Sequence, residues 1–159
     1  MSMTAREAWR ALDADFHHQD SIWRAYAALS GLSDTAFLIL CSLRIDGEGQ
    51  TQNRIAAHWH LAPQSVNSAV RRLTELGYLH LKKQPGSGNS KTLHLTPDGR
   101  RFCRGQVDAL RRAEEEALAQ LSPDELELYI ALTRRITSAV ESSLRRASAR
   151  SKASRKEEP

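Results

Sequence analysis

The apolar positions at the start of the chain follow a helical period and predict two helices. Three aromatic side chains stand seven residues apart: Trp9, Phe16 and Trp23. This spacing places them on one stripe of a helix over residues 4–29. Gly31 ends that helix, and Ser33 is a suitable N-cap for a second helix that continues through Leu43. The glycine-rich residues 46–49 then predict a turn.

The next segment predicts two short helices joined by a tight turn. Thr51 caps the first helix, and Pro63 suits the first position of the second, which Gly77 ends. Apolar residues stand at the offsets that lock together the two helices of a helix-turn-helix: Ile55, Ala56, Trp59, Leu61, Val66 and Ala69. His60 lies at the turn, where many such motifs have glycine. The pattern therefore predicts a helix-turn-helix over residues 51–77.

Two short runs of alternating apolar and polar residues follow, at 78–81 and 91–95, around a glycine-rich loop at 84–90. This pattern predicts an antiparallel β-hairpin. A hairpin that follows a helix-turn-helix directly is typical of a winged helix, and we expect it to be the wing.

The last third of the chain predicts further helices. Thr96 and Pro97 open one that continues to Leu118, and Ser122 with Glu125 forms the capping box of another. The predicted fold class is mainly α with a small β-hairpin wing. We expect an N-terminal dimerisation helix at 1–30, a winged helix-turn-helix DNA-binding domain at 31–96, C-terminal dimerisation helices at 97–147 and a disordered basic tail at 148–159.

The helices outside the winged helix carry apolar stripes that need a surface to bury against. A symmetric homodimer supplies that surface most economically, and the alternative is a monomer that packs the stripes internally. In a dimer the two reading helices would address half-sites about 10–10.5 bp apart.

Composition excludes several classes of protein. The 159 residues are 40% hydrophobic, which is enough for a core. No apolar stretch approaches the ~18 residues that span a bilayer, and residues 1–10 lack the apolar core of a signal peptide. Two cysteines make no disulfide framework. We therefore expect a cytoplasmic protein without a membrane partner.

The positive charge is concentrated in the winged-helix segment. The whole chain has a net charge of +4, but residues 51–105 hold nine basic and two acidic residues. The segments on either side are mildly acidic. A basic block between acidic flanks indicates a surface that faces a polyanion such as DNA.

If the helix after Pro63 turns its apolar residues inward, it exposes polar side chains that can bind base edges and phosphates. Lysines of the hairpin would lie near backbone phosphates. The predicted DNA-binding residues are Arg54, Gln64, Ser65, Asn67, Ser68, Arg71, Arg72, Lys82, Lys83 and Lys91. The competing interpretation is that these side chains are only solvated.

Other chemistries find little support in the sequence. There is no phosphate-binding glycine loop and no nucleophile elbow, so we expect no enzyme, no catalytic residue and no cofactor. The six histidines are poorly spaced for a metal site, and none is predicted. Cys103 lies beside Arg101 and Arg104, which would lower the pKa of its thiol and leaves a redox response open as an alternative.

The chain resembles the MarR family of winged-helix regulators. The segments that carry the resemblance are Gly-Leu-Ser at 31–33, Thr-Gln-Asn-Arg-Ile-Ala at 51–56, Ser-Val-Asn at 65–67, Leu-Thr-Glu-Leu-Gly at 73–77, Leu-Thr-Pro-Asp-Gly at 95–99 and Leu-Ser-Pro-Asp-Glu-Leu at 121–126. It spans residues 5–146. The resemblance implies a homodimer that binds pseudo-palindromic duplex DNA, usually represses transcription, and is often released by a small ligand.

The wing departs from the family's pattern. The family usually has an acidic residue followed closely by arginine just before the Leu-Thr pair, whereas this chain has Ser-Gly-Asn-Ser-Lys at 87–91. Lys91 is the nearest substitute for that arginine. We expect a weaker preference for A·T-rich minor-groove shape than is usual for the family.

For the effector, the first helix offers a set of side chains that could line a cavity: Phe16, His17, Trp23 and Tyr26. Such a set suits a small aromatic ligand, while the competing interpretation makes the aromatic stripe part of the core. The function expected is a MarR-like homodimeric repressor released by a small-molecule ligand. The alternatives are a winged-helix module that binds an acidic protein, and a regulator that responds to redox state or metal.

Overall fold

The computed structural model describes residues 3–83 and 90–157, with side chains up to residue 150. The chain divides into two compact units, Met1–Arg112 and Ala113–Pro159. The first unit holds the winged helix, and the second is dominated by one long helix. The helix over residues 107–118 contributes to both units, because it continues across the boundary.

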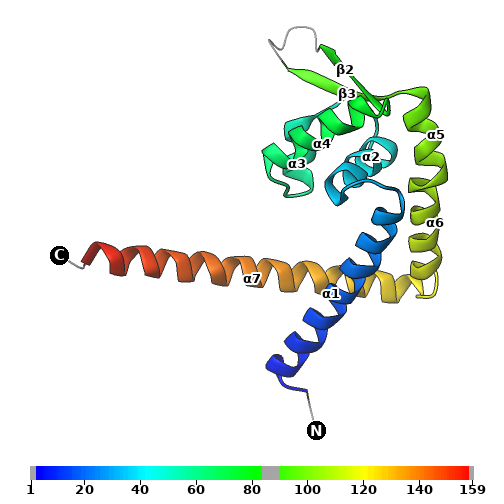
Figure 1. Cartoon of the computed structure of the whole chain (residues 1–159). Helices are drawn as coiled ribbons and strands as arrows, with labels where there is room; N and C mark the ends of the chain where they lie inside the picture. Colours follow the sequence, from blue (N-terminus) through cyan, green and yellow to red (C-terminus); the bar gives the residue numbers. More distant parts are fainter. Residues whose placement is uncertain (1–2, 84–89, 158–159) are drawn as a thin grey trace. The chain divides into compact units, whose positions relative to one another are not determined.

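Figure 1 shows the elements in chain order. They are α1 (Ala5–Leu29), α2 (Asp34–Ile45), β1 (Gln50–Thr51), α3 (Gln52–His58), α4 (Pro63–Glu75), β2 (Leu79–Lys83), β3 (Lys91–Leu95), α5 (Pro97–Gly105), α6 (Val107–Leu118) and α7 (Pro123–Glu157). The structure confirms the helix-turn-helix and the hairpin that the sequence predicts, at nearly the same boundaries.

Side-chain caps begin α1, α2 and α3, and the sequence predicts those at Ser33 and Thr51. Thr4 and Glu7 form a capping box on α1, in which the Thr4 N–H and hydroxyl both donate to the Glu7 carboxylate, at 2.8 and 2.7 Å. These bonds lower the pKa of Glu7. The Ser33 hydroxyl accepts from the Ala36 N–H at the start of α2, and Thr51 caps α3 in the same way.

The core of the first unit is built around α2. Most of this helix is buried, and Phe37 lies at its centre, fully covered. The aromatic rings of Trp23, Tyr26 and Phe102 surround Phe37 edge-on, with centroids 5.6–6.5 Å away. Aliphatic side chains from α3, α4 and the hairpin complete the core. Burial of this one helix therefore joins α1, the helix-turn-helix and α5 into one body.

The sheet has one strand more than the sequence predicts. The strand order is β1-β3-β2, with all pairs antiparallel. β1 is only two residues long, too short to show an alternating pattern. Its position is fixed by Gln50, a buried polar side chain whose amide donates to the carbonyls of Ser42 and Gly47 at 3.0 and 2.8 Å.

The helix predicted to continue from Pro97 to Leu118 is in fact two helices, so that prediction is wrong in detail. α5 ends at Gly105, and α6 begins at Val107. Gln106 between them has φ −104° and ψ −54°, and its carbonyl accepts a hydrogen bond from the Tyr26 hydroxyl at 2.9 Å. Tyr26 lies 80 positions earlier in the chain, so this hydrogen bond is a tertiary contact at the break between the two helices.

A bidentate ion pair joins α2 to α6. The Arg44 guanidinium donates to both carboxylate oxygens of Asp108, at 2.9 and 2.7 Å. These hydrogen bonds hold the pKa of Asp108 below its usual range. The pair helps to fix the start of α6 beside the core.

α7, the long helix of the second unit, begins with the predicted capping box. The Ser122 N–H and hydroxyl both donate to the Glu125 carboxylate at 2.8 Å. α7 then continues to Glu157, well past residue 148, where the sequence predicts a disordered tail. The prediction of a disordered tail is therefore corrected for the residues up to Glu157. Alanine, arginine and lysine favour helix, and a helix already nucleated upstream can be extended without any burial.

Within the part of the chain that the structure describes, no single helix is long and apolar enough to cross a membrane. One pair, α1 with α2, passes that test by length and composition only, and it is bent by 88°.

Candidate nucleic-acid interface

The helix-turn-helix consists of α3, α4 and the turn between them (Figure 1). The turn is closed by the Leu61 N–H, which donates to the Ala56 carbonyl at 2.9 Å. His60 has φ +50°, the left-handed conformation that glycine adopts most easily. A histidine therefore takes the backbone conformation that the motif requires at this position, and its side chain stays exposed.

The two sides of α4 differ sharply. The four apolar residues that the sequence turns inward are all buried: Val66, Ala69, Val70 and Leu73. The six polar residues assigned to base and phosphate contacts are all exposed: Gln64, Ser65, Asn67, Ser68, Arg71 and Arg72. Helical spacing puts Asn67 and Arg71 one above the other. α4 thus presents amide, hydroxyl and guanidinium groups to solvent on a helix held firmly by its other side.

Arg54 on α3 and Arg72 on α4 are two exposed arginines of the helix-turn-helix. Arg54 is exposed on α3, where its backbone N–H donates to the Thr51 hydroxyl, so its side chain takes no part in the cap. Arg72 lies 3.7 Å from Glu75, one turn along α4. Both residues of that pair are more than half exposed, so the attraction is weak and a phosphate could replace it.

The hairpin carries the three predicted lysines at the end of its strands that leads into the connecting loop. Lys82, Lys83 and Lys91 are all exposed, and Lys83 pairs with Lys91 in the strand register. The predicted loop between the strands lies outside the described residues at 84–89. The described part of the wing thus presents its basic residues together at the end away from the core.

The root of the wing is held by Glu48, a residue that sequence reasoning did not single out. Its carboxylate accepts from the Leu95 N–H at 3.2 Å and from the Arg100 guanidinium at 2.7 Å. His94 lies 3.5 Å from the same carboxylate, and its ring stacks on His80 across the two strands at 5.6 Å. These contacts tie the hairpin to the loop after α2 and to α5. Only the fold brings these residues together, so no local signal could have found Glu48.

The effector residues predicted on α1 fall into two groups. Trp23 and Tyr26 pack against the core through Phe37, which supports the interpretation of this part as core. Phe16 is 51% exposed, and His17 lies beside Asp13 at 3.7 Å on the outer part of the helix. The four side chains thus divide between the core and the exposed part of α1.

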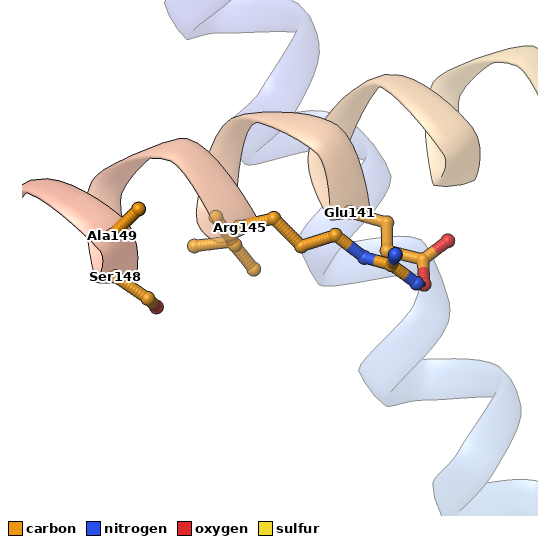
Figure 2. A pocket seen from close by; sticks show the side chains of 5 residues that line it. Glu141, Arg145, Ser148 and Ala149 are labelled. Atoms are coloured by element: carbon orange, nitrogen blue, oxygen red, sulfur yellow. The ribbon is translucent and has the colours of Figure 1, made fainter.

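The hollows on the described surface include two that lie away from these residues. One, with a volume near 400 Å³, lies between Tyr78 and α5, where Phe102 and Arg101 line it. The other is a groove along α7 alone, and Figure 2 shows Arg145 lying along that helix toward Glu141. Neither includes a residue that the sequence assigns to the effector.

The described residues contain no group of three or more histidine, cysteine, aspartate or glutamate side chains that could hold a metal ion. The local argument for a reactive Cys103 is wrong. The side chain is fully buried, and its thiol faces the Leu40 carbonyl at 3.9 Å. Burial raises the pKa of Cys103 to about 11, against a smaller opposite effect of Arg44.

This burial predicts an inert thiol. We expect Ellman's reagent at pH 8 to modify Cys103 of the folded protein at least ~100-fold more slowly than a free thiol, because the thiolate is scarce and covered. Cys41 is buried as well and should behave alike. In guanidinium chloride both should react at once, which is the control. Rapid modification of Cys103 in the folded protein would contradict the prediction.

Comparison with known proteins gives consistent results. Residues 30–88 match the model of the MarR family. The HTH-type transcriptional repressor Rv2887 of Mycobacterium tuberculosis is 29% identical over 97 residues, which cover 60% of this chain and 70% of that protein. A protein from Mycobacterium bovis, the HTH-type transcriptional repressor Mb2911, matches equally.

Solved structures share the fold. NMB1585, a MarR family regulator from Neisseria meningitidis, superposes with a TM-score of 0.73 at 16% identity, covering 85% of this chain and 94% of that one. The M. tuberculosis MarR family protein Rv2887, solved in complex with salicylic acid, has a TM-score of 0.54 at 21% identity, over 85% and 97% of the two chains. The helix-turn-helix and the wing, over residues 30–88, thus match the model of the MarR family, and the fold is the one that solved MarR family regulators share.

Proposed function

We propose that this protein is a homodimeric repressor that binds pseudo-palindromic duplex DNA and is released by a small aromatic ligand. The observation that carries the proposal is the exposed side of α4. Six polar side chains face solvent on a helix whose four apolar residues are buried in the core. A helix held in this way can enter the major groove with its base-reading groups already in place.

Within this proposal the exposed residues have different roles. Asn67 can bind adenine through two hydrogen bonds, and Arg71 can reach a guanine or a phosphate. The hairpin lysines and Arg54 hold phosphates and give no sequence information. The contacts of Glu48 at the wing root fix the hairpin relative to α5 and so hold the wing lysines in place.

The proposed dimer rests on apolar side chains that the described chain leaves exposed. α7 exposes Tyr129, Ile130 and Ile136 at 44–50% of their surface, and α1 exposes Trp9 at 53%. Patches of this kind mark interaction surfaces on folded proteins. A second copy of the chain supplies the same apolar patches, so a symmetric dimer is the simplest way to cover them.

The dimer makes a direct prediction. Ile136→Glu should weaken self-association at least ~100-fold, because it places a charge in an apolar interface. The matched control is Ser138→Glu, since two residues correspond to about 200° of helix and bring the charge to the opposite side. Light scattering during size-exclusion chromatography measures the mass directly. A wild-type protein with the mass of one chain would refute the dimer.

The proposed effector is a small aromatic compound. A salicylic acid complex exists for the M. tuberculosis relative, and this chain has exposed aromatic side chains on α1. Salicylate is therefore the first compound to titrate against a preformed complex with DNA. A fall in DNA affinity on addition of salicylate supports release by a ligand. An unchanged affinity favours the interpretation that the aromatic side chains of α1 belong only to the core and the dimer interface.

The experiment that tests the proposal is a fluorescence-anisotropy titration against duplexes that tile the region upstream of the protein's own gene. Each duplex is compared with its scrambled sequence at about 50 and 200 mM salt, a change that costs proteins with many phosphate contacts ~10³-fold or more. Binding that prefers one duplex over its scramble at both salts supports a regulator that binds a specific operator. Pull-down of fragmented genomic DNA extends the search beyond this region, and failure of both would favour an acidic protein as the partner.

A further inference from the structure

The strongest positive charge outside the winged helix lies at the end of α7. Residues 145–156, here called the basic segment, hold six basic residues and no acidic one: Arg145, Arg146, Arg150, Lys152, Arg155 and Lys156. The remaining six are all serine or alanine. The apolar positions of α7 end immediately before this segment, at Leu144.

The segment is helical. α7 continues through it to Glu157, and every residue from 145 to 150 is exposed. A helix of twelve residues is about 18 Å long. Duplex DNA carries one phosphate charge per ~1.7 Å of its axis, so a rod of this length matches about ten phosphates.

From these observations we infer that the basic segment is a second DNA contact, which binds the phosphate backbone without reading sequence. The inference rests on the proposed function, because the winged helix brings the duplex to the protein. It adds a surface outside the helix-turn-helix and the wing. Its effect is on affinity and salt dependence, while base preference stays with α4.

The interactions of the first two arginines are weak enough to exchange for phosphates. Arg145 donates to Glu141 at 2.5 Å along the surface of α7, as Figure 2 shows, and its side chain is 78% exposed. Arg146 donates to the Ser143 hydroxyl at 2.9 Å. Exposed pairs of this kind contribute little to stability, whereas an arginine can bind a phosphate through two parallel hydrogen bonds.

Two other occupants fit the segment less well. A membrane surface binds amphipathic helices, but the basic segment has no apolar residue larger than alanine to bury among lipids. A second basic segment would be repelled by like charge. A polyanion with closely spaced phosphates is the partner that the composition favours.

The test compares two pairs of arginines on one helix. Arg145→Gln/Arg146→Gln removes two charges from the basic segment, and Arg134→Gln/Arg135→Gln removes two exposed charges upstream on α7. Glutamine keeps the helix propensity of arginine. A third variant replaces all six basic residues of the segment with glutamine. The probe is a 40-bp duplex of random sequence, titrated by anisotropy at several salt concentrations.

We expect the slope of log K against log salt to become less negative by ~0.9 for each phosphate that the variant no longer neutralises. The slope should therefore change by about one to two units in the Arg145/Arg146 variant and by about three to five units in the sixfold variant. Affinity of the sixfold variant near 150 mM salt should fall at least ~10-fold, because several phosphates are left without a basic partner. The Arg134/Arg135 control should match the wild type.

A sixfold variant with wild-type slope and affinity would overturn the inference. A sixfold variant that loses DNA affinity only because it self-associates more weakly, which light scattering detects, would also overturn the inference. So would a sixfold variant that loses binding to vesicles of phosphatidylglycerol and phosphatidylcholine but keeps its affinity for DNA. Preference for a genomic duplex over its scramble should survive in the sixfold variant. If the wild type itself shows no such preference, the proposed function fails, a result separate from the behaviour of the basic segment.

Discussion

Replacing Gly99 with alanine should destabilise the winged helix by about 3 kcal/mol or more, at the upper end of what overpacking costs. A Cβ atom at this position would lie 2.1 Å from the Tyr78 carbonyl oxygen and 3.0 Å from its carbon. Both are backbone atoms, so no side-chain rotation can relieve the clash. The same carbonyl accepts the Thr96 N–H at 3.0 Å, which fixes it further.

Gly105→Ala is the matched control for this change. It lies on the same helix, α5, and an added Cβ there meets nothing within 4 Å. Since alanine favours helix over glycine by up to ~1 kcal/mol, Gly105→Ala should be neutral or stabilising. Thermal unfolding followed by circular dichroism at one fixed protein concentration compares the two variants. Equal melting temperatures would show that α5 does not need the close approach of Gly99.

Arg71→Ala and Asn67→Ala should each reduce the preference for operator over scrambled DNA by about 5- to 150-fold, since one bidentate bond to a base is worth about 1–3 kcal/mol. Both side chains are exposed on the reading side of α4. Their removal leaves the buried side of the helix untouched, so folding should be unaffected. The measurement is the ratio of the two dissociation constants for each variant.

Lys82→Ala serves as the control, because this wing residue should hold a phosphate. We expect it to weaken binding to every duplex by the same factor and to leave the ratio unchanged. Losses of equal size on operator and scrambled DNA for all three variants would contradict the roles assigned to α4 and the wing.

The sequence determined the local elements of this protein. Caps at Thr4, Ser33 and Thr51 mark the helix starts, and their bonds form between neighbours three residues apart. The alternation of buried and exposed residues on α4 follows from helical period alone. The family segments specified the order of helix-turn-helix and wing, and hence most of the proposed DNA-binding residues.

Contacts between residues far apart in the chain were decided only by the tertiary structure. The Tyr26 hydroxyl meets the Gln106 carbonyl at the break between α5 and α6, and at the root of the wing Glu48 meets Arg100. Cys103 illustrates the same limit: its neighbours in sequence are arginines, yet its thiol lies in the core, where burial raises its pKa. Sequence periodicity specifies which side of a helix is apolar, but the electrostatic surroundings of an atom depend on distances that exist only after the chain has folded.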